Sequence, residues 1–161
     1  MTTRTDYLVL GSGIAGLTFA LRASAHGEVT IVTKRASDDS ATNWAQGGVA
    51  AVLAEGDSFA KHAEDTRVAG AGLCHDVVVD LTVEEAPEAM RWLLDQGVPF
   101  TLDESGVLDL GREGGHSERR VAHAGDITGR GLGQHRKSSG VLEVAFDPIG
   151  HAREGCVRRF R

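Results

Sequence analysis

The chain has 161 residues, of which 41% are hydrophobic, and a formal net charge of −6. This length is enough for one domain, and the acidic balance argues against nucleic acid as a partner. All apolar runs fall short of the roughly 18 residues that a membrane-spanning helix needs, so no membrane partner is expected.

The first predicted element is a strand–turn–helix unit. The apolar run Tyr7–Leu10 leads directly into Gly11-x-Gly13-x-x-Gly16, and apolar residues at helical spacing follow. Gly11 would allow the sharp turn, Gly13 the close approach of a diphosphate to the backbone, and Gly16 tight packing of the helix on the sheet. The N–H groups and the positive dipole at the helix N-terminus suit the phosphates. The unit predicts a dinucleotide site.

A second strand is predicted at Glu28–Lys34, a β-branched run that would complete a βαβ unit. NAD sites usually have an acidic residue near the end of this strand, which binds the ribose 2′-OH. Lys34 and Arg35 stand there instead. The pair is compatible with the 2′-phosphate of NADP, with an FAD site whose ribose is held by backbone or water, or with a solvated strand end. This position alone does not decide between them.

A polar loop that ends in two glycines follows, over residues 40–48 (Ser-Ala-Thr-Asn-Trp-Ala-Gln-Gly-Gly). Its hydroxyl, amide and backbone donors suit an extended polar ligand with a flat ring system, although such clusters also occur in plain loops. Gly47 and Gly48 would allow a close approach of the backbone.

Helices and a hairpin are predicted further along the chain. The expected elements are a helix capped by Asp57–Ser58 and reaching about Ala69, helical regions over 76–83 and 84–96, and a hairpin over 98–110 turned at 104–106. Pro87 would be tolerated in the first turn of the third helix. The pattern indicates an α/β fold: a Rossmann-like βαβ unit with following helices and a β-hairpin.

Histidine and cysteine spacing gives no metal motif. The seven histidines form no HxxxH pair, and none stands at ligand spacing from a cysteine. Cys74 and Cys156 are far apart and lie in no CxxC arrangement. Because the N-terminus has no secretory leader pattern, we expect two reduced thiols, no metal site and a cytoplasmic protein.

Two strings resemble a known family. Residues 41–48 resemble the flavin loop of the succinate dehydrogenase/fumarate reductase flavoprotein family. Residues 112–130 (Arg-Glu-Gly-Gly-His-Ser-Glu-Arg-Arg-Val-Ala-His-Ala-Gly-Asp-Ile-Thr-Gly-Arg) resemble its L-aspartate oxidase branch, and residues 62–72 and 92–100 fit the same pattern. The resemblance runs from about residue 6 to 130.

The resemblance implies a set of FAD-binding residues. They are the pyrophosphate turn Gly11, Ser12, Gly13, Ile14, Ala15 and Gly16, then Lys34 at the adenosine ribose, and the flavin loop Ala41, Thr42, Asn43, Trp44, Ala45, Gln46, Gly47 and Gly48. Respiratory dehydrogenases carry a flavin-bonded histidine where this chain has Ala41, so the FAD should be non-covalent.

The resemblance also implies a substrate residue and a reaction. Glu113 falls on the catalytic-site glutamate whose carboxylate can accept from the ammonium group of L-aspartate; the alternative is an exposed carboxylate paired with Arg112 or Arg119. His116 and His123 could line the substrate cavity or pack in loops. The expected reaction is FAD-dependent oxidation of L-aspartate to iminoaspartate in NAD biosynthesis, with oxygen or fumarate as electron acceptor and a functional link to quinolinate synthase.

Two other functions remain open from the residues, a non-catalytic nucleotide-binding fragment and a succinate- or fumarate-type dehydrogenase. Ala41 and Glu113 disfavour the dehydrogenase.

The pattern changes after residue 130. Residues 131–161 hold six Lys and Arg against three Asp and Glu, whereas the preceding part is strongly acidic. We therefore expect residues 1–130 to be the N-terminal part of an FAD-binding domain, incomplete relative to the family. Residues 131–161 are expected to be a divergent tail, disordered or frameshifted. Val141–Phe146 could form a strand, and the Arg-rich end should be irregular.

Overall fold

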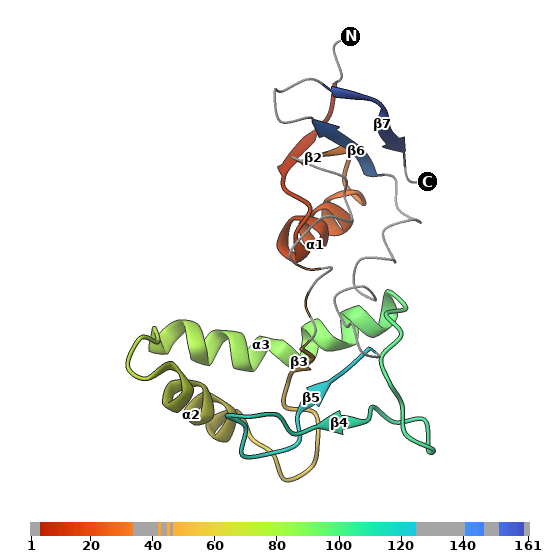
Figure 1. Cartoon of the computed structure of the whole chain (residues 1–161). Helices are drawn as coiled ribbons and strands as arrows, with labels where there is room; N and C mark the ends of the chain where they lie inside the picture. Colours follow the sequence, from red (N-terminus) through yellow and green to blue (C-terminus); the bar gives the residue numbers. More distant parts are fainter. Residues whose placement is uncertain are drawn as a thin grey trace. The chain divides into compact units, whose positions relative to one another are not determined.

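The computed structural model describes residues 4–33, 42, 45 and 47–124, and the backbone of 141–146 and 152–159. The chain divides into two compact units, Met1–Ala45 with Leu132–Arg161, and Gln46–Gly131 (Figure 1).

The first unit is a four-stranded sheet with one helix. Its elements are β1 (Tyr7–Leu10), α1 (Ile14–Ala23), β2 (Val29–Thr33), β6 (Val141–Phe146) and β7 (Ala152–Arg159), with strand order β1-β2-β6-β7. The first three strands in this order are parallel, and β7 is antiparallel to β6. Parallel neighbours need a crossover, which α1 supplies between β1 and β2. The expected βαβ unit is confirmed.

The core of the first unit lies between α1 and the sheet. Leu17, Ala20 and Ala23 of the helix are buried in one cluster with Val9, Val29 and Ile31 of the strands. The helical residues recur at three-residue spacing, so they lie on one face of α1, and the strand residues alternate, so they lie on one face of the sheet. This packing fixes the turn between β1 and α1.

The C-terminal segment is more regular than the sequence predicts. The expected strand at Val141–Phe146 is confirmed, but the expectation of an irregular Arg-rich end is wrong for Ala152–Arg159, which forms β7. The reason is that β6 has an open edge: pairing there, for example Val144 with Val157, gives partners to the N–H and C=O groups of both strands.

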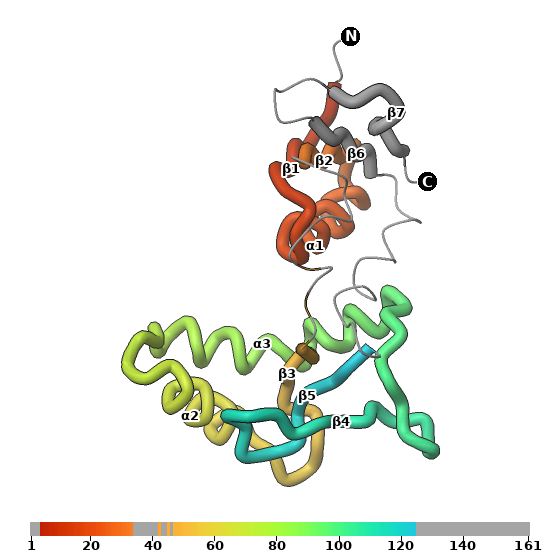
Figure 2. Tube along the Cα trace, viewed as in Figure 1, coloured from red at the N-terminus to blue at the C-terminus, as the bar shows by residue number. Residues whose placement is uncertain are grey.

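The second unit combines two helices with a small antiparallel sheet. Its elements are β3 (Val49–Ala50), α2 (Phe59–Gly70), α3 (Asp76–Asp95), β4 (Leu110–Gly111) and β5 (Val121–Ala122), with strand order β3-β5-β4. The two helices lie side by side (Figures 1 and 2), and Ala63 of α2 is buried in a cluster with Val79 and Val83 of α3. Ser58 caps α2 as expected, because its Oγ accepts from the Lys61 N–H at 3.2 Å.

The structure of the second unit differs from two predictions in detail. The two helical regions expected at 76–83 and 84–96 form one helix, α3, with Pro87 in its interior. Val79, Val83, Pro87 and Met90 are all buried, so a continuous apolar stripe offsets the hydrogen bond that the proline removes. The expected hairpin keeps its turn, where Gly106 has φ +83°, but only one bridge, between Leu102 and Leu108.

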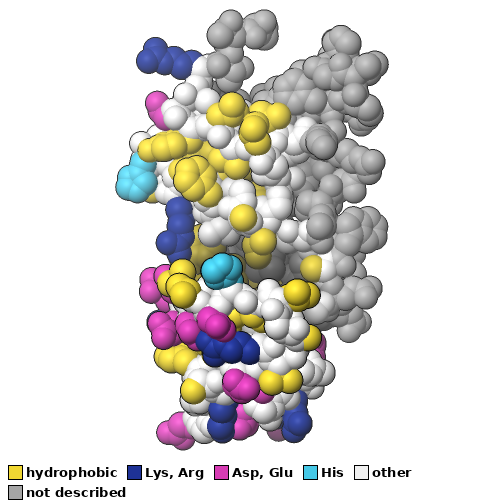
Figure 3. Space-filling view, turned by 90° about the vertical axis from the view of Figure 1, so that its left-hand side faces the viewer, with side chains coloured by type: hydrophobic (Ala, Val, Ile, Leu, Met, Phe, Trp, Pro, Cys, Tyr) yellow, Lys and Arg dark blue, Asp and Glu magenta, His cyan; other side chains and the backbone are white. Residues whose placement is uncertain are grey.

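Both units expose large hydrophobic side chains. Examples are Leu8 and Leu10 on the first unit and Leu73 and Val77 on the second, and the face in Figure 3 shows hydrophobic and charged side chains interspersed. Among the residues that the structure describes, no helix is both long enough and apolar enough to span a membrane.

Candidate functional site

The glycine turn after β1 has the geometry that a diphosphate requires. Gly11 has φ +106°, which a side chain would strain, and its N–H donates to the Val32 carbonyl at 2.8 Å. A Cβ on Gly16 would collide with the carbonyl oxygen of Gly11, so the helix packs on the turn only because position 16 is glycine. A Cβ on Gly13, by contrast, would meet no described atom within 4 Å. The backbone of the turn is therefore tightly packed at Gly16, whereas the space next to Gly13 is open to a ligand.

The helix N-terminus at this opening has a glycine as its N-cap residue. Gly13 has no side chain, so the first N–H groups of α1 receive no cap from the N-cap residue itself. The Ile14 N–H donates to Oγ1 of Thr42 at 3.0 Å, which brings one member of the predicted flavin loop to the start of α1. The donors, the dipole and the open space fit the pyrophosphate of a dinucleotide.

Some of the predicted cofactor residues cannot be placed. Lys34, Ala41, Asn43, Trp44 and Gln46 lie outside the described residues. Of the loop, Thr42 and Ala45 belong to the first unit, and the Ala45 N–H donates to the Thr42 carbonyl at 3.3 Å. Gly47 and Gly48 belong to the second unit.

Glu113 lies in the loop between β4 and β5 and has a histidine partner. Its Oε1 is 3.3 Å from Nε2 of His123, and both side chains are partly exposed, at 46% and 31%. The two arginines considered as alternative partners are engaged elsewhere: Arg112 donates to the His116 carbonyl, and Arg119 donates to the Leu110 carbonyl and lies 3.9 Å from Asp109. The structure thus brings Glu113 together with His123.

A buried ion-pair network that the sequence reasoning missed holds the same loop. Arg120 is fully buried, and its Nε and Nη2 donate to the two carboxylate oxygens of Asp57, both at 2.8 Å. Its Nη1 donates to Oδ2 of Asp65 at 2.5 Å, and Asp65 also accepts from the backbone N–H and hydroxyl of Ser117. The network ties the loop end to α2 and its cap.

The acidic members of this network are stabilised in the charged form. The backbone hydrogen bond from Ser117, aided by its hydroxyl and by Arg120 against the effect of burial, lowers the pKa of Asp65 to about 2. Burial opposes ionisation of Asp57, but hydrogen bonds from Arg120 and Ser58 outweigh it and lower the pKa of this carboxyl. Both carboxylates are therefore charged at neutral pH, opposite one buried guanidinium.

Two histidines complete the cluster. His62 of α2 is buried, and its ring lies edge-on to that of His116 with 5.6 Å between the centroids. Within the described part of the chain, Nδ1 of His62 has no hydrogen-bond partner. Burial, with the charges of Arg120 and His116, lowers the pKa of His62. The His116 ring thus packs against His62 and Arg120. Among the described residues, no side-chain contact joins His116 to Glu113.

The sequence carries a signal for part of this network, but none for the pairing of Arg120 with its two carboxylates. His62 and Asp65 are three residues apart, so they share one face of α2. Arg119 and Arg120 are neighbours next to a strand, so they point to opposite sides: Arg119 outward, and Arg120 into the cluster.

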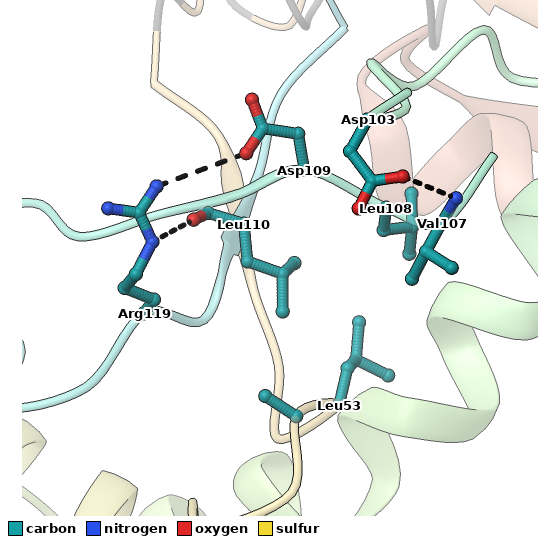
Figure 4. A pocket seen from close by; sticks show the side chains of 8 residues that line it. Leu53, Asp103, Val107, Leu108, Asp109, Leu110 and Arg119 are labelled. Carbon is teal, nitrogen blue, oxygen red and sulfur yellow. Dashed lines mark hydrogen bonds and ion pairs between the residues drawn. The ribbon is translucent and has the colours of Figure 1, made fainter. Parts of the chain in front are cut away.

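A surface hollow elsewhere in the second unit is not the candidate site. It has a volume of about 510 Å3 and is lined by Leu53, Ala54, Asp103, Val107, Leu108, Asp109, Leu110 and Arg119 (Figure 4). None of the predicted site residues lines it. The described residues also contain no group of His, Cys, Asp and Glu side chains that could hold a metal ion.

The comparisons with known proteins agree with this geometry. A family model described as FAD binding domain matches residues 6–146, which extends past residue 130. The chain is 51% identical over 146 residues to a chloroplastic L-aspartate oxidase of Nicotiana tabacum, covering 91% of this chain and 22% of that protein. It is 49% identical over 134 residues to an L-aspartate oxidase of Pseudomonas aeruginosa, covering 79% of this chain and 25% of that protein.

A solved structure shows the same fold. The Escherichia coli quinol fumarate reductase matches with a TM-score of 0.76 and 32% identity over 84% of this chain and 24% of its own. The chain thus spans about a quarter of the length of the relatives that it matches. Since the family model covers most of the chain and the glycine turn has the required geometry, this chain belongs to the FAD-binding domain family of flavoproteins, and its cofactor is FAD.

Proposed function

We propose that this chain is the FAD-binding segment of an L-aspartate oxidase, which oxidises L-aspartate to iminoaspartate in NAD biosynthesis. The observation that carries the proposal is Glu113, a partly exposed carboxylate whose Oε1 lies 3.3 Å from Nε2 of His123 and which pairs with neither Arg112 nor Arg119. Identities of about 50% to L-aspartate oxidases over this segment support the same substrate.

In this proposal the first unit holds the cofactor. The turn from Gly11 to Gly16 binds the pyrophosphate, since Gly13 leaves room and the start of α1 supplies N–H donors. Lys34 lies near the adenosine ribose, and residues 41–48 line the flavin. Ala41 has no nucleophile, so the FAD is non-covalent.

The second unit supplies the substrate contact. The Glu113 carboxylate accepts from the ammonium group of L-aspartate, a charge-assisted hydrogen bond. A dicarboxylate without an amine has no group for this contact, so Glu113 favours the amino acid. The flavin, when bound, supplies the chemistry of accepting a hydride from the substrate α-carbon. The acid–base group for this step is not among the motif-bearing residues of this chain.

The remaining expectations belong to the whole protein. We propose oxygen or fumarate as the electron acceptor, a functional link to quinolinate synthase, and a cytoplasmic location. Residues 1–130 are taken as the N-terminal part of the FAD-binding domain.

A graft tests the proposed function directly. Residues 6–130 of this chain replace the matching segment of the P. aeruginosa L-aspartate oxidase, and the purified graft is reconstituted with FAD. We expect hydrogen peroxide production that depends on L-aspartate and exceeds the free-flavin background. A graft that retains FAD and interconverts succinate and fumarate, but does not turn over L-aspartate, would identify a dehydrogenase instead. A graft that retains FAD without either activity would favour a nucleotide-binding module.

A further inference from the structure

A histidine whose role the sequence leaves open lies beside the predicted substrate residue. His123 directly follows β5, and Glu113 follows β4 by two residues. The contact of 3.3 Å between His123 Nε2 and Glu113 Oε1 therefore joins two antiparallel strands through their side chains.

The imidazole of His123 lies close to two glycines, one just before β3 and one in β4. A Cβ on Gly48, the residue before β3, would be 3.0 Å from Cε1 of His123. A Cβ on Gly111 of β4 would be 3.0 Å from Nε2. Both distances are tighter than ordinary van der Waals contact, so a side chain at either position would crowd the ring. At Gly48 it would collide first with Cγ1 of Val121 and with the Ala122 carbonyl oxygen, whereas at Gly111 the ring itself is the nearest neighbour. Gly48 is also the last residue of the predicted flavin loop, which places that loop end next to the Glu113–His123 pair.

The backbone beneath this ring is firmly held. The His123 carbonyl accepts from the Thr101 N–H at 2.7 Å, and the preceding Val121 and Ala122 are 2% and 0% exposed. The ring itself remains partly exposed, as does Glu113. A rigid base with an accessible polar end is the arrangement that fixes the direction of a neighbouring group without burying it.

We propose that His123 is a positioning residue for Glu113: its Nε2–H donates to Oε1 and turns Oε2 toward the ammonium group of an amino-acid substrate. This inference rests on the proposed function. A glutamate side chain on a loop samples several rotamers, and an anchored oxygen removes most of that freedom before the substrate binds. Gly111 then leaves room for the ring.

The contact is tested first on this chain. Long-range proton–nitrogen correlation spectra of the purified chain report which ring nitrogen of each histidine carries the proton. We expect His123 to carry it on Nε2, and Glu113→Ala to change this signal while that of the exposed His75 stays in place. An Nδ1–H tautomer at neutral pH, or a His123 signal indifferent to Glu113→Ala, would overturn the proposal.

Its consequence is tested in the graft by separating binding from turnover. His123→Phe keeps a planar ring but removes the donor, whereas His123→Gln places an amide N–H at a similar reach. We expect His123→Phe to raise KM for L-aspartate roughly 5- to 20-fold with kcat within about threefold. His123→Gln should restore most of the loss, and His75→Phe, at an exposed site in the same unit, should behave as the unmodified graft.

The outcomes separate this inference from the proposed function. If the unmodified graft does not oxidise L-aspartate, the proposed function fails. If it does and His123→Phe leaves KM unchanged, or if His123→Gln is as impaired as His123→Phe, the positioning role fails while the function stands. Affinity for succinate provides the control for structural damage: it should be the same in all three histidine variants, and a parallel loss for succinate and L-aspartate would also overturn the proposal.

Discussion

Removing the Arg120 guanidinium should lower the free energy of unfolding of the second unit far more than removing the guanidinium of the neighbouring Arg119. Arg120→Met leaves the carboxylates of Asp57 and Asp65, which are 1% and 16% exposed, without their cation. Breaking a buried pair from one side costs about 3–5 kcal/mol, because a charge stays buried and unpaired. Arg119→Met is the matched control: its side chain is 69% exposed and lies 3.9 Å from Asp109, so the loss should stay below about 1 kcal/mol.

A double variant tests the cause. Asp57→Asn keeps an acceptor for the Ser58 N–H but removes the stranded charge. Combined with Arg120→Met, it should recover at least about 1 kcal/mol of the lost free energy of unfolding, since the two residues are directly coupled. The other single variant, Asp57→Asn alone, should also destabilise, because it weakens both hydrogen bonds from Arg120.

The assay must report on the second unit separately from the first. Urea unfolding followed by far-ultraviolet circular dichroism gives the overall free energy, and hydrogen exchange of peptides from α2 and β5 gives the local one. Equal losses for Arg120→Met and Arg119→Met, or no recovery in the double variant, would refute the view that the buried network holds this unit together.

Four further predictions concern pH and the cofactor. The pKa of His62 is lowered in the folded state, so stability should fall as pH drops below about 6.5, where the unfolded histidine takes up a proton, and His62→Gln should flatten this part of a pH–stability curve. Asp65, with its pKa lowered to about 2, should contribute stability above about pH 3.8 and lose it as pH falls toward 2; a Tm that does not change between pH 5 and 2 would contradict this. Gly13→Val should abolish FAD retention measured by gel filtration, because its side chain fills the open space at the start of α1, whereas Gly114→Ala, at another uncrowded position, should retain FAD. Acid precipitation of the flavin-loaded graft should release all its flavin, and fluorescence remaining on the denatured band would contradict the non-covalent attachment implied by Ala41.

The parts of the fold that depend on local backbone requirements are predictable from sequence. The turn at Gly11 needs a positive φ, Gly16 must lack a side chain, and Ser58 caps α2. Each of these features is predicted by the identity of one or two residues. The prediction of two separate helices over 76–83 and 84–96 is wrong, because the buried stripe of α3 continues on both sides of Pro87. Tertiary packing outweighs the hydrogen bond that the proline removes.

The parts that depend on distant partners are not. Arg120 meets Asp57 and Asp65 across 63 and 55 residues, and no periodicity or spacing connects these positions. The pairing of Glu113 with His123 likewise follows from the register of β4 on β5. This register places the His123 ring against Gly111 and close to the Glu113 carboxylate. The strand β7 forms because β6 offers an open edge, a property of the sheet and not of residues 152–159 themselves.

The most direct test of the central claim is the substrate discrimination of Glu113→Gln in the graft. This change removes the negative charge that would face the substrate ammonium group and keeps the shape of the side chain. Losing one charge-assisted contact costs about 1.5–3 kcal/mol, or on the order of 10- to 150-fold in kcat/KM. We expect oxidation of L-aspartate to fall by this factor, while fumarate reduction driven by an artificial electron donor such as reduced methyl viologen, in the absence of L-aspartate, changes little. Equal losses with both substrates would show that Glu113 maintains structure and does not recognise the amino group.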